Sequence, residues 1–343
     1  MHIETGPLEA VDTDQRTIMK IAVPDMISNS YFPLVAAVGL GLFEAHNLDV
    51  SLHLMSPADK AYDALKQGHV DFVGAEAHAA LAVFPSWHGM KLLCAQAQGM
   101  YWFLVMRSEL GVRRGDVAAV KGRRIGAAPW VELGLRRLLL AAGIDPLRDE
   151  VHIGPIPGTD SLKVNTGVTA ARALEAKAID GFWANGMGAE LAVRRGIGTI
   201  VLDVRRGEGP RGCFDYTLAT VAATDQLIEN APEKVAAVIR AIVASQTALK
   251  KDITLAAAVG RKYFPSEEAE LIAGIVSRDL PFYDASISEK TVTAMNQFAR
   301  GVGLLHDDPS YGDVVAVQYR NLWRADTDKH TGLLLPGGPQ PQT

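Results

Sequence analysis

A pattern of helix, short apolar strand and polar loop occurs twice in this chain of 343 residues. The first copy spans residues 61–78, and the second begins 109 positions later and spans residues 170–185. Each copy has an Ala-Leu pair in its helical part and a β-branched residue before an aspartate, Val70-Asp71 in the first and Ile179-Asp180 in the second. Two such units predict two similar lobes, whose strand ends face each other across a cleft.

The composition is that of a globular protein, with 48% hydrophobic and 21% charged residues, and the length allows two domains of ordinary size. A net charge of −5, spread along the chain, gives no electrostatic footprint for a nucleic acid. Two cysteines are too few for a disulfide framework or a thiolate metal site. The histidines show no metal-ligand spacing, so we expect neither a metal ion nor a cofactor.

The beginning of the chain bears on where the protein works. Residues 1–16 are acidic and contain no apolar run, whereas a secretory signal needs about 7–15 apolar residues after a basic start. No later stretch has the roughly 18 apolar residues of a membrane span. We therefore expect a cytoplasmic protein if this is the native start, and a periplasmic one if a leader was removed. Residues 1–16 and 326–343 are expected to be flexible tails.

The order strand, helix, strand, helix, strand recurs in both halves, which predicts parallel strands with right-handed crossovers. The predicted fold class is α/β: two lobes, each a mostly parallel sheet flanked by helices, with a helical C-terminal part. Lobe 1 is expected to comprise residues 17–107 and 218–325, and lobe 2 residues 108–217. Besides the two copies of the motif, strands are expected at 17–23, 48–55, 91–96, 101–106, 123–128, 151–156, 198–204 and 216–223, and helices at 31–43, 78–84, 131–142, 188–195, 232–249, 253–264, 266–277 and 288–302.

Ligands of open α/β sheets bind outside the carboxyl ends of the strands, and this rule selects the first group of candidate residues. Ser28, Asn29, Ser30 and Tyr31 follow the first strand at the start of a helix, where free backbone N–H groups suit an anionic group. The alternative is that Ser28 or Ser30 only caps that helix. The two interpretations are compatible.

Glu76 and His78 follow the third strand and form the second group of candidates. They could contact a polar ligand or act as an acid–base pair. The alternative is that His78 packs against the next helix and that Glu76 pairs with a nearby base. Gln98 and Tyr101 lie near the crossing into the second lobe and are further candidates.

The second lobe supplies the candidates on the opposite side of the predicted cleft. Trp130 begins the helix after the first strand of this lobe, Trp183 and Asn185 end the second copy of the motif, and Tyr216 lies beside the return crossing. Aromatic residues at facing strand ends could sandwich a flat or apolar ligand. Core packing is the alternative for each of them.

Three segments carry a resemblance to a known family: residues 31–43, with Tyr-Phe-Pro-Leu-Val-Ala-Ala and Gly-Leu-Phe, residues 64–72 and residues 120–126. With them the chain resembles the type 2 periplasmic-binding-protein fold. It is most similar to the family of the nitrate, sulfonate and taurine receptors of ABC transporters and of the thiamine-pyrimidine synthases. The resemblance implies a two-lobed protein that binds a small molecule, with an ABC-transporter permease as a partner, but the fold hosts many functions.

The chain departs from the enzyme branches of that family. The pyrimidine synthases have a lysine for pyridoxal phosphate in the loop after the third strand, whereas residues 75–78 contain none, and the sulfinate desulfinases have a cysteine where this chain has Ser28-Asn29-Ser30. We therefore expect a solute-binding protein that closes by hinge motion, near residues 107–111 and 212–217, around a small anionic or heteroaromatic molecule as the receptor of an importer. The alternative is a cytoplasmic enzyme, a lyase, decarboxylase or pyrimidine-synthesis-like protein, with Glu76 and His78 as acid–base groups.

Overall fold

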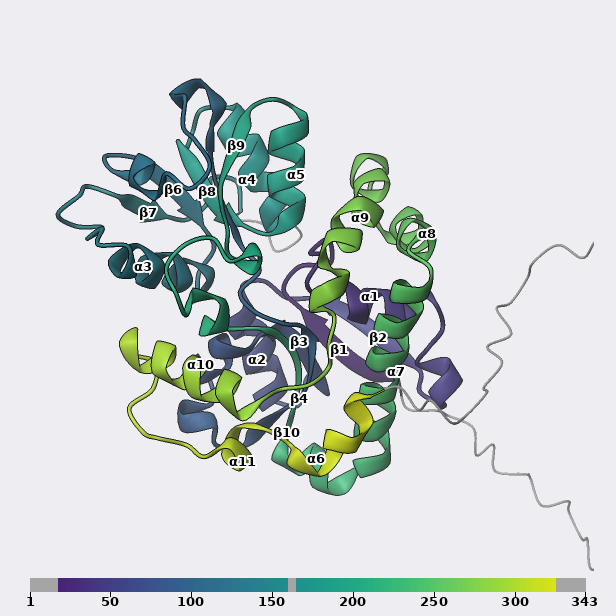
Figure 1. Ribbon diagram of the computed structural model, residues 1–343. Coiled ribbons are helices and arrows are strands. Elements are labelled where there is room, and N and C mark those ends of the chain that lie inside the picture. The colour runs from purple at the N-terminus through teal and green to yellow at the C-terminus, as the bar shows by residue number, and fades with distance from the viewer. Residues whose placement is uncertain (1–17, 160–164, 325–343) are drawn as a thin grey trace, which may run out of the picture.

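The structure is a computed structural model, which describes residues 18–159 and 165–324. Two mixed sheets of five strands each dominate it, and helices flank both (Figure 1). We use "first lobe" for the sheet that contains the N-terminal strand with its helices, and "second lobe" for the other sheet with its helices. The predicted tails at residues 1–16 and 326–343 lie outside the described residues.

The sheet of the first lobe has the strand order β2-β1-β3-β10-β4. Strand β10 is antiparallel to both of its neighbours, while β1 is parallel to β2 and β3. The chain thus enters this sheet twice, because β10 returns after the second lobe is complete. The strands are β1 Met19–Val23, β2 Val50–Leu54, β3 Phe72–Glu76, β4 Met90–Ala97 and β10 Ala219–Thr224.

The sheet of the second lobe repeats this arrangement with the order β7-β6-β8-β5-β9. Here β5, which carries the chain over from the first lobe, is the antiparallel strand, and β6 is parallel to β7 and β8. Both sheets are therefore mostly parallel, as predicted. The strands are β5 Phe103–Arg107, β6 Arg124–Ala127, β7 His152–Gly154, β8 Gly181–Ala184 and β9 Gly198–Asp203.

The helices cover both sheets, and two of them join the lobes. Helices α8 and α9 pack against each other, α8 against α1 of the first lobe and α9 against α5 of the second (Figure 1). No helix among the described residues is long and apolar enough to cross a membrane. The helices are α1 Phe32–Gly39, α2 Ala58–Lys66, α3 Val131–Ala141, α4 Thr166–Glu175, α5 Gly186–Arg194, α6 Asp225–Asn230, α7 Pro232–Lys251, α8 Thr254–Tyr263, α9 Ser266–Asp279, α10 Glu289–Gly301 and α11 Tyr311–Val314.

The aspartate of the repeated motif has the same task in both lobes. In the second lobe, the Asp180 carboxylate accepts the backbone N–H of Arg124 at 2.9 Å, and Asp180 donates its own backbone N–H to the Arg124 carbonyl at 2.8 Å. In the first lobe, Asp71 makes the same two bonds with Lys20, at 2.7 and 2.8 Å. Each aspartate thereby ties the start of its own strand to the start of the neighbouring strand.

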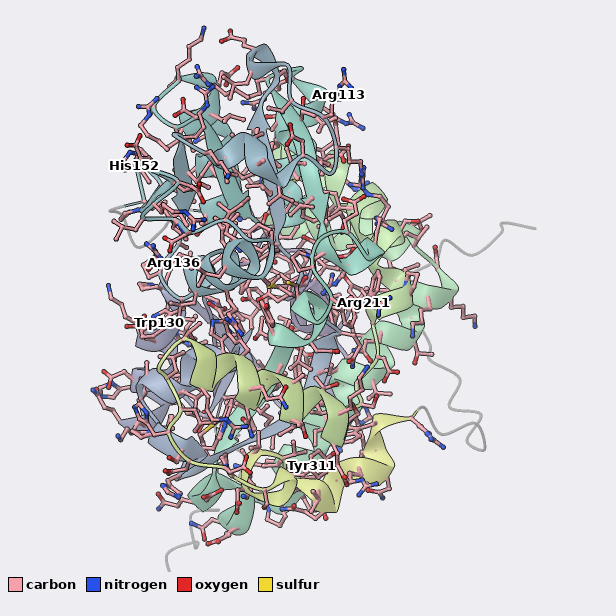
Figure 2. The ribbon with its side chains drawn as sticks, turned by 60° about the vertical axis from the view of Figure 1, so that its left-hand side comes forward. Arg113, Trp130, Arg136, His152, Arg211 and Tyr311 are labelled. Carbon is pink, nitrogen blue, oxygen red and sulfur yellow. The ribbon has the colours of Figure 1, made fainter. Side chains whose placement is uncertain are left out.

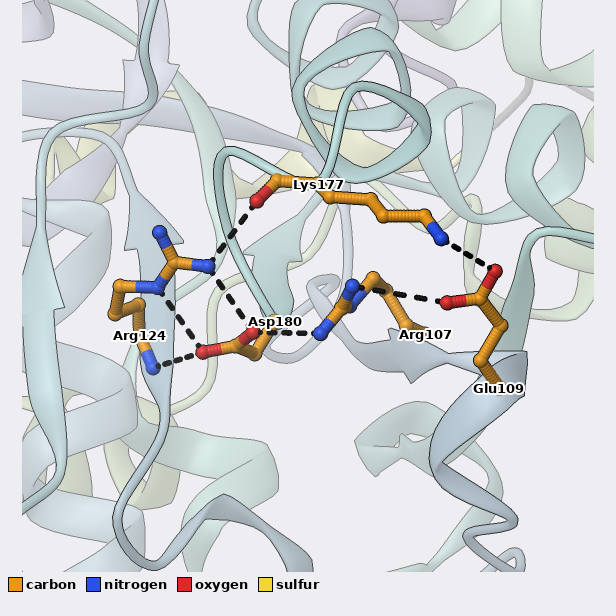
Figure 3. Close-up of polar contacts among 5 residues, drawn as sticks. All are labelled: Arg107, Glu109, Arg124, Lys177 and Asp180. Atoms are coloured by element: carbon orange, nitrogen blue, oxygen red, sulfur yellow. Dashed lines mark hydrogen bonds and ion pairs between the residues drawn. The ribbon is translucent and has the colours of Figure 1, made fainter.

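Around Asp180 this pairing grows into a network of charges on the surface (Figure 3). Arg107, the last residue of β5, donates to Asp180 at 2.9 Å, the Arg124 guanidinium reaches the same carboxylate at 3.2 Å, and Lys177 pairs with Glu109 at 2.8 Å. These donors, opposing the effect of burial, hold the pKa of the Asp180 carboxyl below its ordinary value. The network fixes the end of the second sheet that lies opposite to the carboxyl ends of β6 and β8.

Several predicted boundaries differ from the structure. Strand β3 ends at Glu76, so Glu76 belongs to the sheet and not to the loop after the third strand. The helix predicted at residues 78–84 is a 3-10 helix at Ala77–Ala82, which Pro85 follows. Helices α6 and α11 were not predicted, because each is only one turn or little more. The division into lobes at residues 107 and 217 stays a prediction, although β5 pairs within the second sheet.

Candidate functional site

A cavity of about 40 Å³ lies where the carboxyl ends of the two sheets meet. That volume is enough for roughly three water molecules, so a larger ligand needs the lobes to move apart. The residues around it lie at or after the ends of β1, β2, β3, β6 and β8, lie in the crossing between β4 and β5, or begin helix α4. They are Pro24, Asp25, Ser28, Tyr31, Ser56, Pro57, Ala58, Glu76, Tyr101, Trp102, Ala128, Pro129, Val131, Thr166, Trp183, Ala184 and Asn185.

Asp25, two residues after β1, joins the two lobes through its carboxylate. Its Oδ2 accepts a hydrogen bond from Nδ2 of Asn185 at 2.7 Å, and its Oδ1 accepts one from Nδ2 of Asn165. Oδ1 also accepts the backbone N–H of Ile27 at 2.9 Å. Burial raises the pKa of Asp25 to about 7, against the opposing effect of these three donors. The carboxyl therefore titrates near neutral pH.

The two asparagines that bind Asp25 are also the N-caps of helices α4 and α5. The Oδ1 atom of Asn165 accepts the backbone N–H of Val168 at 2.7 Å, and that of Asn185 accepts the N–H of Met187 at 3.1 Å. Each amide thus uses its oxygen on its own helix and its nitrogen on Asp25. Because helix N-termini attract negative charge, both helices favour the ionised form of Asp25.

Glu76, Tyr31 and Tyr101 form a buried chain of hydrogen bonds on the wall of the cavity. The Tyr31 hydroxyl donates to Oε2 of Glu76 at 2.5 Å and lies 2.5 Å from the Tyr101 hydroxyl. Burial raises the pKa of Glu76, which the bond from Tyr31 opposes. Burial and the charge of Glu76 raise the pKa of Tyr31 and Tyr101 well above the usual tyrosine value. Both tyrosines therefore stay protonated and can donate.

Aromatic rings make up much of the remaining wall. The rings of Tyr101 and Trp102 have centroids 4.9 Å apart, and those of Trp102 and Trp183 lie 6.2 Å apart. Trp183 is fully buried, yet its Nε1–H has no hydrogen-bond partner among the described residues. A ligand with an acceptor atom could satisfy this donor, and its flat part could lie against the rings.

The structure does not bring His78 to the cavity with Glu76. Its side chain is fully buried, with Nδ1 at 2.9 Å from the Thr217 hydroxyl and Nε2 at 3.0 Å from the Trp130 carbonyl. The carbonyl can only accept, so Nε2 carries the proton. Burial lowers the pKa of His78 to about 4, and the ring stays neutral near pH 7. His78 therefore joins the lobes rather than serving as an acid or base in the cavity.

Asn29 and Gln98 also hold parts of the fold together and do not line the cavity. The Asn29 amide donates to Asp279 at the end of α9 and accepts the backbone N–H of Gly186 at 3.1 Å. The Gln98 side chain donates to the carbonyls of Asp284 and Ser286, at 2.8 and 2.6 Å. Both residues satisfy backbone or charged groups at the junction of the lobes.

The other predicted residues have different places. Ser28 lines the cavity, and its Oγ accepts the backbone N–H of Ser30 at 3.4 Å, while no side chain among the described residues caps helix α1. Trp130 packs partly buried against the first lobe at the edge of the molecule (Figure 2), and Tyr216 stacks on Phe298 with centroids 4.7 Å apart. Neither lines the cavity. Six of the twelve predicted residues do: Ser28, Tyr31, Glu76, Tyr101, Trp183 and Asn185.

Asp25 and Trp102 line the cavity and Asn165 binds Asp25, but the sequence analysis did not select these three residues. Asp25 lies in the loop after the first strand, and the rule that selected Ser28 there applies equally to it. Trp102 lies in the apolar run of residues 101–106, whose pattern is that of a buried strand. Asn165 carried no strong signal, because its role depends on how the second lobe sits against the first.

Gly167 provides a test of the geometry around Asn185. A Cβ on Gly167 would lie 2.2 Å from Oδ1 of Asn185, the atom that caps α5. We expect Gly167→Ala to displace that amide and to lower the free energy of unfolding by about 1–3 kcal/mol in urea titrations. The matched control is Gly154→Ala in the same lobe, where a Cβ meets nothing within 4 Å. Equal stability of the two variants would contradict the described packing.

The fold is shared with several solved structures. A protein from Bordetella bronchiseptica RB50 has a TM-score of 0.70 and 18% identity over 89% of this chain and 96% of its own. The ligand-binding component of an ABC-type import system from Staphylococcus aureus has a TM-score of 0.66 and 14% identity, over 90% and 99%. The alkanesulfonate-binding protein SsuA from Xanthomonas axonopodis pv. citri, bound to MOPS, has a TM-score of 0.64 and 16% identity, over 90% and 98%.

At these identities the structures show the fold alone, which is that of the periplasmic binding proteins, as the sequence predicted. No curated protein matches the chain by sequence. The sequence model of the family described as "NMT1/THI5 like" matches residues 28–252, well over half of the chain. The chain therefore belongs to the NMT1/THI5-like family.

Proposed function

We propose that this protein is a solute-binding protein that closes its two lobes around a small molecule, as the receptor of an ABC-type importer. The observation that carries the proposal is the cavity between the lobes, whose walls come from both sheets and meet across the Asp25 carboxylate. Two proteins of the same fold are described as a ligand-binding component of an import system and as an alkanesulfonate-binding protein, which supports it. Such a receptor works in the periplasm and delivers its ligand to a permease.

The proposed binding residues are those that line the cavity with a polar or aromatic group. Trp102, Trp183 and Tyr101 offer a flat aromatic surface, which favours an unsaturated or heteroaromatic part in the ligand. The polar contacts would come from both lobes. They are Asp25, Ser28, Tyr31, Glu76 and Asn185.

Closure requires hinges, which we place where the chain crosses between the sheets. The two crossings run from β4 to β5 and from β9 to β10. The second contains the predicted hinge at residues 212–217. For the first, residues 98–102 replace the predicted 107–111, because Arg107 is already paired within the second sheet. Rotation at these two segments would separate the lobes without breaking either sheet.

The enzymatic alternative assigned acid–base roles to Glu76 and His78 together. Glu76 lines the cavity, but both ring nitrogens of His78 are in hydrogen bonds elsewhere. A ligand in the cavity can therefore meet only one of the two groups. No specific observation favours catalysis over binding, and we retain the receptor as the proposed function.

The first test identifies the ligand. Protein purified from its natural host is denatured, and the released small molecules are measured by mass spectrometry. Adding the compound back to stripped protein is expected to raise the melting temperature and to decrease the radius of gyration in X-ray scattering, because binding selects the closed lobes. Turnover of the compound, or a thermal shift without closure, would contradict the receptor proposal.

Trp183 offers a second prediction. Trp183→Phe removes the unpaired indole N–H while keeping an aromatic ring. We expect about a tenfold weaker affinity for the identified ligand in calorimetry, corresponding to one lost hydrogen bond of about 1.4 kcal/mol. The control is Trp323→Phe, which removes an indole bonded to the Leu93 carbonyl at 2.8 Å outside the cavity. An unchanged affinity of Trp183→Phe would show that the indole N–H of Trp183 does not bind the ligand.

A further inference from the structure

The ionisable side chains on the wall of the cavity are all acids. They are the carboxyls of Asp25 and Glu76 and the phenols of Tyr31 and Tyr101. Within residues 18–159 and 165–324, no lysine, arginine or histidine lines the cavity. Arg205 contacts the Tyr101 ring, at 5.5 Å from its centroid, but its charge is paired with Asp279. The ligand therefore meets an acidic surface.

The helix N-termini that could attract an anion in the second lobe are already engaged. Helices α4 and α5 both point their caps at Asp25, which accepts from Asn165 and Asn185. A helix N-terminus corresponds to roughly half a positive charge, so two of them balance about one carboxylate. Because Asp25 already balances the charge of these helix N-termini, they would attract a second anion only weakly, and the Asp25 carboxylate would repel it.

Glu76 is less well compensated than Asp25. It is 3% exposed, and among the described residues its carboxylate receives one side-chain donor, the Tyr31 hydroxyl. Asp59, in the first turn of α2, raises the pKa of Glu76 further, and its own Oδ1 is buried without a partner among the described residues. A buried carboxylate with so few donors is costly, and a cation in the cavity would remove much of that cost.

Two further features of the cavity wall bear on the chemistry of the ligand. Tyr101, Trp102 and Trp183 present aromatic rings, which attract a cation as well as a flat ligand. The unpaired Nε1–H of Trp183, a fully buried side chain of this wall, requires an acceptor atom. A ligand that suits this wall therefore carries a positive charge, N–H donors for the Glu76 carboxylate and one acceptor atom for the Trp183 N–H.

We propose that the cavity binds a small organic cation of the amine or amidine class, with its N–H groups directed at Glu76 and its positive charge against the aromatic wall. The inference rests on the proposed function, because it names the ligand class of the same site. It replaces the anionic ligand that the sequence led us to expect, and it agrees with the expected heteroaromatic one where that ligand carries a protonated nitrogen.

Three probes of nearly the same shape separate charge from shape: benzamidinium, benzamide and benzoate, which carry charges of +1, 0 and −1. Benzamidinium has no acceptor for the Trp183 N–H and benzamide has one, so a preference for benzamidinium would come from its charge. Their dissociation constants are measured at pH 8 by calorimetry with stripped protein. We expect benzamidinium to bind at least tenfold more tightly than benzamide, with benzoate the weakest. Binding of benzoate or benzamide as tight as that of benzamidinium would overturn the inference, and so would the failure of all three to bind.

Glu76→Gln tests whether the charge of Glu76 attracts the cation. The variant keeps the shape of the side chain and removes its charge, so the loss of affinity should be at least tenfold larger for benzamidinium than for benzamide. The control is Glu175→Gln, an acid that pairs with Arg195 on the surface of the second lobe and should change neither. Equal weakening for both probes would indicate a structural effect and would contradict the inference.

These outcomes are distinct from a failure of the proposed function. A native ligand that is released by denaturation and closes the lobes supports the receptor whatever its charge. If that ligand is an anion, the cation inference alone fails. If no compound closes the lobes while benzamidinium still binds in a Glu76-dependent way, the receptor proposal fails and the cation site stands.

The affinity for benzamidinium should also depend on pH. Burial raises the pKa of Asp25 to about 7 and raises the pKa of Glu76 above its ordinary value, so a cation must compete increasingly with bound protons as the pH falls. Between pH 8 and pH 5.5 we expect the affinity to fall by at least tenfold, while that for benzamide stays constant. The titratable groups that face the two carboxyls are Tyr31, Asp59, Tyr62 and Tyr101. The phenols have pKa values raised by burial and do not ionise in this range.

Discussion

Asp279→Ala is expected to lower the free energy of unfolding by about 3–5 kcal/mol. The Asp279 carboxylate accepts Nη1 of Arg205 at 2.7 Å, and the two side chains are only 4% and 3% exposed. The same oxygen accepts the amide of Asn29, so the substitution leaves a buried guanidinium and a buried amide without their acceptor. Removing one partner of a buried ion pair is strongly destabilising, because the other charge stays buried and uncompensated.

Urea unfolding followed by fluorescence measures this effect, and a double-mutant cycle separates its cause. The double variant with Arg205→Met and Asp279→Ala should lose less free energy of unfolding than the two single variants lose together, because no uncompensated charge remains. The control is Asp308→Ala, whose carboxylate pairs with Arg300 at 2.7 Å but is 89% exposed, and we expect at most about 1 kcal/mol there. Additive effects in the cycle would contradict the ion-pair explanation.

This ion pair also connects the junction of the lobes to the cavity. Arg205 donates its Nε–H to the Gln98 carbonyl at 2.9 Å and lies over the rings of Tyr101 and Phe282. Tyr101 in turn reaches Tyr31 and, through it, Glu76. Asp279→Ala should therefore weaken ligand binding as well as stability, although Asp279 itself does not line the cavity.

The fold could be predicted from the sequence because the sequence patterns that indicate it are local and occur once in each lobe. The pairs Val70-Asp71 and Ile179-Asp180 mark the same position in both lobes. The structure shows the same two hydrogen bonds at each aspartate, one to its carboxylate and one from its backbone N–H. Alternation of helical and strand patterns then fixes the parallel topology. The ends of the strands were predicted less well, as at Glu76, because the hydrophobic pattern locates a strand better than its last residue.

The lining of the cavity was only half predictable, for a different physical reason. The rule that ligands bind at the carboxyl ends of strands needs only local order, and it found Ser28, Glu76 and Trp183. The rule cannot tell which polar residues at the strand ends line the cavity and which form hydrogen bonds across the junction of the lobes. His78 and Asn29 do so, because their partners Trp130, Thr217 and Asp279 come from distant parts of the chain.

Asp25→Ala is expected to open the protein. Asp25 accepts one hydrogen bond from each of two second-lobe asparagines, and both bonds are lost when the lobes separate. Hydrogen bonds to a charged group contribute about 1.5–3 kcal/mol each, so the variant should lose at least about 3 kcal/mol of closure free energy. The ratio of closed to open molecules would then fall by a factor of about 100.

Single-molecule fluorescence transfer measures this ratio directly. Dyes attached through Lys60→Cys on α2 and Leu147→Cys in the second lobe lie on exposed positions on the two sides of the cleft, and the native Cys94 and Cys213 are buried. The transfer efficiency should fall in Asp25→Ala and stay unchanged in Asp252→Ala, whose carboxylate caps only Thr254 in its own neighbourhood. Because Asp25 binds both α4 and α5, Asn165→Ala alone should have about half the effect. An Asp25→Ala protein as closed as the wild type would mean that packing of α8 and α9, and not this carboxylate, holds the lobes together.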